Sequence, residues 1–284
     1  MRLGVSNYSF ESHVKKNGCD YAEICRLARE MGFEGIEFVA LDSGVFKAGE
    51  DPAESAEKIK ECCEKEGLEI IAYTVGANLL SENIEEEVCR AKARIDVAAL
   101  LGAPIFRHDV CYSLKKIEGY TFENAIEEMV PVIRELSDYA AEKGIRTCTE
   151  NHGYVFQDPH RVKALMEAVD HPNYGWLCDI GNFLCVDADV IESVKIAAPF
   201  TLHVHAKDFL WRPGTEERPE GYFGTSGGNY LKGTVIGDGA VPVKESLDIL
   251  KKAGYNGWVS LEFEGSEDPL DALKTGKERL LQWI

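Results

Sequence analysis

Short apolar segments alternate with longer amphipathic ones along the whole chain, and this alternation restricts the folds that the chain can adopt. Several of the longer segments end at a glycine that leads directly into an apolar run, as in Glu66-Gly67-Leu68, Lys143-Gly144-Ile145 and Ala253-Gly254-Tyr255. A glycine after the last helical turn is a common helix stop. The repeated unit therefore predicts helices that lead directly into strands, which is typical of α/β folds with a parallel sheet.

The apolar runs predict eight strands, at residues 2–8, 35–39, 68–75, 104–108, 145–150, 174–179, 200–205 and 257–263. Apolar residues at helical spacing predict eight helices, at residues 21–31, 52–66, 82–101, 121–143, 158–169, 188–197, 242–253 and 269–284. Pro131 falls inside the fourth helix, where a kink or a break is expected because proline removes a backbone hydrogen bond. Eight strands alternating with eight helices predict an α/β fold that closes into a (β/α)8 TIM barrel. An open doubly wound sheet is the alternative that this count disfavours.

The chain has 284 residues, of which 45% are hydrophobic and 28% are charged. No linker or low-complexity segment divides it, so residues 1–284 are expected to form a single domain. Its apolar runs are far shorter than the roughly 20 residues that span a bilayer, so no membrane segment is expected. A strand is expected directly at the N-terminus, which leaves no room for a signal peptide and predicts a cytoplasmic protein.

The charge and the cysteines exclude further classes. A net charge of −18 repels the phosphates of nucleic acids, so no nucleic-acid partner is expected. The nine cysteines are scattered and form no Cys-x-x-Cys pair. They are expected to be free thiols in a reducing compartment.

Residues 206–241 form a long segment with neither helical nor strand periodicity. The segment is rich in glycine and proline and also carries Trp211, Tyr222, Phe223 and Tyr230. Disordered segments are poor in aromatic residues, so an ordered excursion is expected. It follows the seventh expected strand, on the side where barrels carry their sites, and is therefore expected to act as a lid or a pocket wall.

Four of the expected strands end in residues of types that bind metal ions: Glu150, Asp179, His205 and Glu262. The carboxyl ends of barrel strands meet at one mouth, so these side chains are expected to converge. Three carboxylates and one imidazole suit Mn²⁺ or Mg²⁺, with Co²⁺ or Zn²⁺ as alternatives. Any one of them alone is as well explained by a structural role, such as Asp179 capping the next helix. Four comparable strand ends together favour one shared metal site.

Residues two apart on a strand share a face, so His203 and His205 are expected to point the same way. The fourth expected strand ends in Phe106-Arg107-His108-Asp109. Here His108 is a candidate base or substrate contact. Arg107 is explained equally well by hydrogen bonds within a charged strand end.

Four runs resemble the xylose isomerase-like barrel superfamily, often described as sugar phosphate isomerases or epimerases. These runs are Glu150-Asn151-His152-Gly153, Cys178-Asp179-Ile180-Gly181-Asn182, His203-Val204-His205-Ala206-Lys207-Asp208 and Ser260-Leu261-Glu262-Phe263-Glu264-Gly265. The run Gly237-Asp238-Gly239-Ala240-Val241-Pro242 resembles that family's Gly-x-Gly-x-hydrophobic segment before the last βα unit. The resemblance implies a TIM barrel with one divalent ion held by Glu150, Asp179, His205 and Glu262.

The resemblance also implies roles in catalysis. In the ketose 3-epimerase members the two glutamates, here Glu150 and Glu262, form an acid/base pair. One removes a proton next to the sugar carbonyl and the other returns one on the opposite face, while the metal stabilises the enediolate oxygens. This chain departs from those members at Asn182, where they carry a substrate-binding histidine. Together with Asn182, His152 and Lys207 are candidates for substrate binding.

The leading hypothesis is therefore a metal-dependent isomerase or epimerase that acts on a sugar or keto-sugar. One alternative is a lyase or dehydratase that acts on a keto-polyol or 3-keto-glycoside, with His108 as an added base. An endonuclease for abasic DNA, which shares the superfamily, is disfavoured because it uses a trinuclear zinc site with more histidines than the seven present here. A barrel that only binds sugar is a fourth reading, which the two glutamates oppose. The expected partner is a small carbohydrate; a homo-oligomer or a partner subunit stays open.

Overall fold

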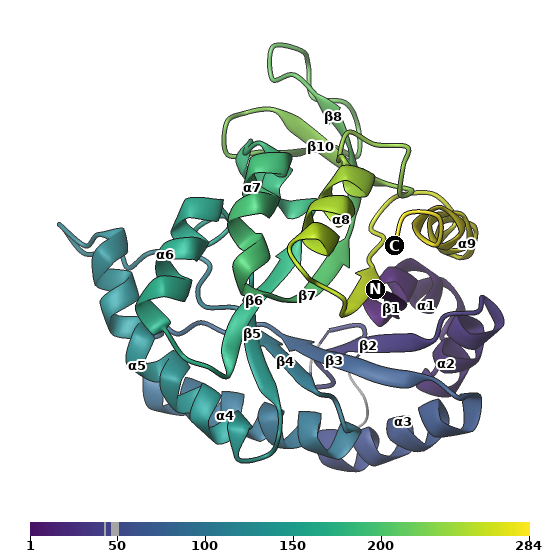
Figure 1. The fold of residues 1–284 in the computed structure, drawn as a ribbon, viewed down its shortest axis with the longest axis horizontal. Coiled ribbons are helices and arrows are strands. Elements are labelled where there is room, and N and C mark those ends of the chain that lie inside the picture. The colour runs from purple at the N-terminus through teal and green to yellow at the C-terminus, as the bar shows by residue number, and fades with distance from the viewer. Residues whose placement is uncertain (43, 47–50) are drawn as a thin grey trace.

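Eight parallel strands close into a barrel at the centre of the molecule (Figure 1). The computed structural model describes residues 1–42, 44–46 and 51–284. The barrel strands are β1 (Arg2–Ser6), β2 (Gly35–Val39), β3 (Glu69–Val75), β4 (Ile105–His108), β5 (Arg146–Glu150), β6 (Tyr174–Asp179), β7 (Thr201–Ala206) and β11 (Trp258–Leu261). Their order around the barrel is β1-β11-β7-β6-β5-β4-β3-β2, and β1 pairs in parallel with both β2 and β11. The predicted (β/α)8 barrel is confirmed.

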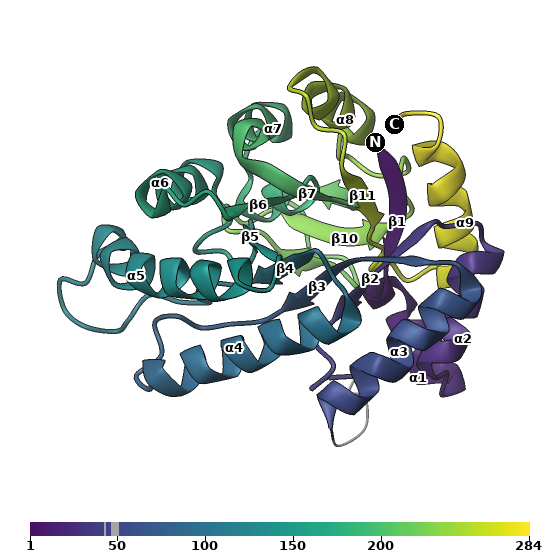
Figure 2. The same cartoon turned by 60° about the horizontal axis from the view of Figure 1, so that its bottom comes forward.

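Helices surround the strands on the outside (Figure 2). They are α1 (Glu11–Asn17), α2 (Tyr21–Glu30), α3 (Pro52–Glu66), α4 (Ile84–Leu101), α5 (Phe122–Ala141), α6 (Pro159–Val169), α7 (Val190–Ala197), α8 (Val243–Lys252) and α9 (Pro269–Leu280). Gly67 and Gly102 end α3 and α4 in the left-handed conformation, with φ of 70° and 76°. Glycine adopts this conformation without the penalty that a Cβ atom brings, which explains the glycine stops in the sequence.

Most of the predicted elements lie within a few residues of the observed ones, and three differences have a physical reason. The first strand ends at Ser6 because a 3-10 turn, Asn7–Phe10, follows it. Helix α1 was not predicted; it has no buried residue and therefore no apolar periodicity. A kink or a break was predicted at Pro131, and a break is contradicted, because α5 continues through this residue. Pro131 is exposed, so water can satisfy the carbonyl that proline leaves without a donor.

The segment 206–241 is not irregular, which corrects the prediction from its composition. It contains β8 (Asp208–Arg212), β9 (Phe223–Gly224) and β10 (Tyr230–Thr234). These strands form a separate antiparallel sheet in the order β8-β10-β9, which extends away from the barrel beyond β7 (Figure 1). The short strands were not predicted because the segment is rich in glycine and proline, and both residue types are depleted in ordinary strands.

Asp208 anchors this small sheet to the chain that returns to the barrel. Its carboxylate accepts hydrogen bonds from four backbone N–H groups, those of Phe209, Gly237, Gly239 and Val241, at 2.8, 2.8, 3.0 and 3.0 Å. A Cβ atom on Gly239 would lie 2.1 Å from Asp208 Oδ1, so only glycine fits there. The Gly-x-Gly run in the sequence thus serves the close approach of the backbone to one carboxylate.

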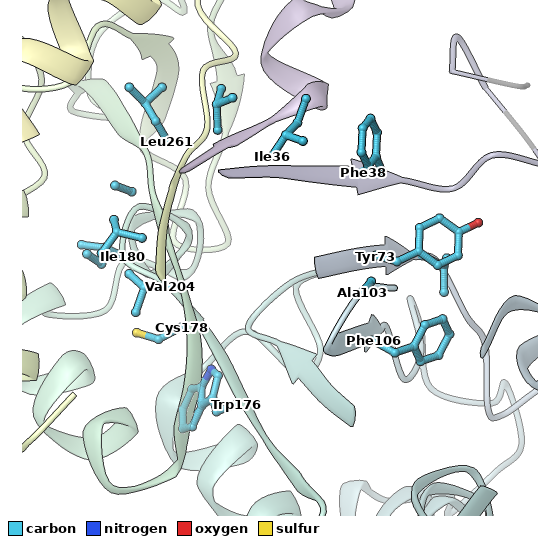
Figure 3. Close-up of a cluster of buried hydrophobic side chains, with 14 of the residues drawn as sticks. Ile36, Phe38, Tyr73, Ala103, Phe106, Trp176, Cys178, Ile180, Val204 and Leu261 are labelled. Atoms are coloured by element: carbon cyan, nitrogen blue, oxygen red, sulfur yellow. The ribbon is translucent and has the colours of Figure 1, made fainter. Parts of the chain in front are cut away.

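Apolar and polar side chains alternate along the barrel strands. On β2, Ile36 and Phe38 belong to the hydrophobic core, whereas Glu37 between them is a fully buried charge. Figure 3 shows the apolar set, including Tyr73 from β3 and Val204 from β7. Because successive residues point to opposite faces, the polar set lies on the other side of the strands, inside the barrel. In the described part of the chain, no helix has the length and apolar character to cross a membrane.

Candidate metal centre and active site

The four residues expected to share a metal ion come together at the carboxyl end of the barrel. Glu150 and Asp179 end β5 and β6, His205 lies near the end of β7, and Glu262 follows β11 directly. In the sheet register His205 pairs with Asp179 on one side and with Ser260 on the other. One ligand atom from each of the four residues lies within 4.8 Å of the others, and all four side chains are buried. A donor set of three carboxylates and one imidazole can hold a divalent ion.

Glu37 of β2 determines the orientation of His205. Its carboxylate accepts hydrogen bonds from Nε2 of His205 at 2.9 and 3.0 Å, from Nε2 of His203 at 2.7 Å and from Oγ of Ser260 at 3.0 Å. Burial lowers the pKa of His205, but Glu37 and Glu262 bring it well above its ordinary value. In its neutral form, with the Nε2 proton donated to Glu37, the ring would present the lone pair of Nδ1 to a cation. That atom lies 3.5 Å from Glu262 Oε2, 3.8 Å from Asp179 Oδ2 and 3.9 Å from Glu150 Oε1. A carboxylate behind a ligating imidazole is a recurrent arrangement at metal sites.

Two buried atoms in this cluster lack hydrogen-bond partners. They are Nδ1 of His205 and Oδ2 of Asp179, both within the described part of the chain. A buried polar atom without a partner is costly, and most such atoms in folded proteins are paired. Since both atoms face the same small volume, the four residues fit a cation placed among them.

Asp179 uses its two oxygens differently. Oδ1 accepts hydrogen bonds from the backbone N–H groups of Gly181 and Asn182 at 2.8 and 2.9 Å. The capping role considered for this residue is therefore real, but it occupies one oxygen only. Oδ2 faces His205, and Asn151 fixes the backbone of Asp179 through hydrogen bonds at 3.0 and 2.8 Å.

Glu150 is held from two sides. Arg107 of β4 forms an ion pair and hydrogen bond with Oε2, and Nδ2 of Asn182 donates to Oε1 at 2.8 Å. Asn182, a sequence candidate for substrate binding, thus contacts a candidate catalytic carboxylate directly. Burial raises the pKa of Glu150, and the opposing effects of Arg107 and His205 do not cancel this shift.

Lys207 lies close to three carboxylates of the site. Its Nζ lies 2.6 Å from Glu262 Oε2, 3.2 Å from Asp179 Oδ2 and 3.6 Å from Glu264 Oε1. Burial alone would raise the pKa of Glu262, but Lys207 and His205 bring it well below the ordinary value. Glu262 is therefore ionised at neutral pH, and Lys207 keeps its proton among these carboxylates.

A cavity of about 370 Å³ opens beside the cluster, and we call it the inner cavity. Its polar and charged wall residues include Tyr8, Arg107, Glu150, His152, His205, Lys207, Glu262 and Glu264. Cavities of this size hold small organic molecules. The candidate metal ligands thus form part of the wall of a site that can accept one sugar-sized ring.

His152 lies at the edge of this cavity, partly open to solvent. Its Nδ1 is 3.2 Å from Asp109 Oδ1. Burial lowers the pKa of His152, but the carboxylate of Asp109 more than offsets that effect and the net shift is upward. The pair supplies an imidazole that can donate a proton at the cavity wall.

His108 lies elsewhere, and the structure gives no support to its predicted role as a base or substrate contact. Its ring is fully buried between Phe106 and Tyr174, with ring centroids 6.1 Å from each. Its neighbour Arg107 lines the inner cavity instead. The reason is strand alternation: on β4 the inward position is 107, and 108 points toward the helices.

Two residues of the site, Glu37 and Arg107, were not predicted from the sequence. Glu37 was taken only as part of a strand, although a glutamate in the middle of Gly-Ile-Glu-Phe-Val is an unusual buried charge and a usable signal. Arg107 was not assigned to the site from the sequence. Its role depends on the distant partner Glu150, which local pattern cannot reveal.

We predict that Glu37→Gln weakens binding of Mn²⁺ by about 10- to 100-fold, because the amide no longer fixes the tautomer and the position of His205. Calorimetric titration of metal-free protein measures this. Glu34→Gln, which changes an exposed carboxylate near the other end of β2, is the matched control. Equal affinities for the two variants, with unchanged melting temperatures, would contradict the assigned role of Glu37.

Comparisons with known proteins agree with this architecture. A family model described as "Xylose isomerase-like TIM barrel" matches residues 25–283. A curated relative, the inosose dehydratase of Geobacillus thermodenitrificans, is 28% identical over 224 residues, which cover 74% of each chain. Another inosose dehydratase, from Histophilus somni, is 31% identical over 141 residues. That alignment spans 48% of this chain and 46% of the relative.

Solved structures share the fold at low identity. The IOLI protein with a bound zinc atom has a TM-score of 0.76 at 20% identity and covers 100% of this chain and 98% of its own. The probable 3-DHS dehydratase AsbF from Bacillus anthracis has a TM-score of 0.74 at 21% identity, with 99% of both chains covered. The D-allulose 3-epimerase from a Methylomonas species has a TM-score of 0.72 at 18% identity, with 100% and 98% covered.

Proposed function

The chain belongs to the xylose isomerase-like TIM barrel family, and on that basis we propose that it is a divalent-metal-dependent lyase that dehydrates a cyclic keto-polyol. The observation that carries the proposal is the buried donor set of three carboxylates and one imidazole, in which Asp179 Oδ2 and His205 Nδ1 have no hydrogen-bond partner. Glu150, Asp179, His205 and Glu262 would hold the ion. When bound, a divalent cation there supplies Lewis acidity toward a substrate carbonyl oxygen.

Glu150 is the proposed base. It lines the inner cavity, and Arg107 and Asn182 hold its carboxylate in one orientation. Its raised pKa brings it closer to the range in which a carboxylate abstracts protons efficiently. Removal of the proton next to a carbonyl is the first step of both dehydration and epimerisation.

His152 is the proposed acid for dehydration, whereas His108, predicted as an added base, is buried away from the inner cavity. The imidazole carries its proton next to the cavity and is supported by Asp109. Dehydration breaks the C–H bond on the carbon next to the carbonyl group and the C–O bond on the carbon after it. A C=C bond forms between these carbons, the first proton goes to Glu150, and the proton from His152 leaves with the hydroxyl as water.

Similarity to relatives named inosose dehydratases supports dehydration of a cyclic keto-polyol, because an inosose is a keto-inositol. Asn182 supports it as well. This residue stands where the ketose 3-epimerases carry a substrate-binding histidine, and here it binds Glu150.

Epimerisation of a keto-sugar is the second candidate. One observation favours it: two carboxylates, those of Glu150 and Glu262, line the same cavity and could exchange protons with opposite faces of a ring. The D-allulose 3-epimerase also shares the fold. Lys207, beside Glu262, would then bind a substrate oxygen.

Product analysis in D₂O separates the two reactions. The protein with Mn²⁺ is incubated with a keto-inositol and, separately, with ketohexoses, and products are followed by NMR and mass spectrometry. Dehydration predicts loss of one water from the keto-inositol and appearance of an absorbing conjugated carbonyl. A product of unchanged composition, with deuterium at one inverted carbon, would establish the epimerase instead and reject the lyase.

A further inference from the structure

A second cavity, of about 620 Å³, lies beside the inner one, and we call it the outer cavity. Tyr8, Glu11 and Glu264 line both cavities, so the two spaces meet along a common wall. The outer cavity contains none of the four candidate metal ligands. Neither the chemistry proposed above nor the inner cavity accounts for it.

The far wall of the outer cavity comes from the small sheet. Glu220, Gly221, Phe223, Lys232 and Gly233 belong to the excursion that carries β9 and β10. β10 is docked on the segment after β11, because Gly233 pairs with Gly265 and Thr234 Oγ1 donates to Glu267 Oε1 at 2.8 Å. The wall is therefore fixed relative to the barrel mouth.

Close packing at this junction depends on a missing side chain. A Cβ atom on Gly233 would lie 2.5 Å from the backbone oxygen of Glu264. Glycine lets the sheet approach Glu264, the residue that both cavities share. The excursion thus adds an aromatic side chain, Phe223, to the lining of the outer cavity.

The charge of the outer cavity selects against anions. Among the residues that the structure describes, its charged wall residues are the glutamates at positions 11, 220 and 264 and one lysine, Lys232. None of the described arginines lines it, and arginine is the side chain best suited to bidentate phosphate binding. A phosphate group placed here would face more negative than positive charge.

The remaining wall suits a neutral, hydroxylated ring. Tyr8, Phe223 and Phe263 offer apolar faces, while Ser12 and the carboxylates can accept hydrogen bonds from hydroxyl groups. Small-molecule sites combine apolar and aromatic walls with a few polar groups in this way.

We propose that the outer cavity binds a neutral, hydroxylated substituent carried by the reacting keto ring, such as a second sugar ring in glycosidic linkage. The inference rests on the proposed function, since it takes the inner cavity as the place of reaction. It specifies that the reacting cyclic keto-polyol carries a glycosidic substituent, and it excludes a phosphate group in that place.

The test compares the binding of three probes: a methyl keto-glucoside, the matching keto-disaccharide and a keto-glucose phosphate. Calorimetry with Mn²⁺-loaded Glu150→Gln protein measures binding without turnover. We expect the disaccharide to bind about tenfold tighter than the methyl glycoside, as one added set of apolar contacts typically gives. The phosphate should show no such gain.

Two variants test whether the tighter binding of the disaccharide arises in the outer cavity. In the same Glu150→Gln background, Phe223→Ala removes an aromatic wall, and Ser12→Trp fills the cavity from an exposed position. Both should abolish the advantage of the disaccharide and leave the affinity of the methyl glycoside unchanged. Trp211→Ala, an exposed aromatic residue of the same sheet outside both cavities, should preserve the advantage.

A phosphate that binds tighter than the disaccharide, or a Ser12→Trp protein that keeps the full advantage, would overturn the proposal. The two proposals fail separately. Absence of turnover by the wild-type protein refutes the proposed reaction, whereas the subsite is judged from binding alone.

Discussion

Replacing Glu150 with glutamine is expected to lower kcat by about 100- to 10,000-fold, the range typical of a lost general base. The amide has nearly the same shape and retains one oxygen for a metal ion, but it cannot accept the substrate proton. Arg107 and Asn182 donate to different oxygens of this carboxylate, so the amide oxygen keeps one of them as a partner and the amide nitrogen faces the other. Steady-state turnover of the keto-polyol at saturating Mn²⁺ measures the effect.

Glu57→Gln, at an exposed position of α3, is the control and should leave kcat unchanged. A metal titration of Glu150→Gln accompanies the kinetics, so that loss of the base is separated from loss of the ion. A Glu150→Gln protein that binds Mn²⁺ and turns over at the wild-type rate would remove Glu150 from the chemistry.

Removal of divalent metal by a chelator is expected to abolish turnover, and Mn²⁺ or Mg²⁺ is expected to restore it. The ion should also stabilise the fold, because three buried carboxylates repel one another around His205. Binding to the folded state alone contributes about 2.7 kcal/mol when the free ion is at about a hundred times its Kd. Thermal unfolding with and without Mn²⁺ measures this, next to the activity assay.

Asp179→Asn is the matched variant for the metal experiment. The asparagine Oδ1 can still accept hydrogen bonds from the N–H groups of Gly181 and Asn182, but the amide nitrogen replaces the oxygen that faces His205. We expect a stable protein whose melting temperature no longer responds to Mn²⁺. Full turnover of chelator-treated wild-type protein, or an Asp179→Asn protein with an unchanged Mn²⁺ response, would count against the metal centre.

The barrel could be predicted from the sequence because its signals are local. Apolar runs such as 35–39 and 174–179, and glycine stops such as Gly67, are readable within a few residues. The small sheet at 208–234 could not be predicted in the same way. Its strands are short and contain glycine, and they pair only after the chain returns to the barrel mouth.

The candidate site was predictable to the extent that it follows strand ends. Glu150, Asp179, His205 and Glu262 all occupy inward positions at the same mouth, so a topological argument was enough to bring them together. His108 was chosen as a site residue because it ends its strand. The end of a strand does not determine toward which face its last residue points, and on β4 it is residue 107 that points inward.

Local pattern marks Glu37 as an unusual charge inside an apolar run, but it cannot identify the partners of this residue. Its partners His203 and His205 are 166 and 168 residues away in the chain, and only closure of the barrel brings β2 and β7 to opposite sides of one carboxylate. The same is true of Arg107 and Glu150, whose strands β4 and β5 are neighbours in the sheet.

We propose that Glu150, Asp179, His205 and Glu262 hold one divalent cation, with His205 binding through Nδ1 because its Nε2–H group donates to Glu37. Anomalous diffraction from crystals soaked in Mn²⁺ tests it most directly. We predict one strong peak per chain among these side chains, about 2.0–2.3 Å from Nδ1 of His205 and from carboxylate oxygens. A fully soaked crystal without a peak at this position, or with the ion bound only elsewhere on the chain, would contradict the account.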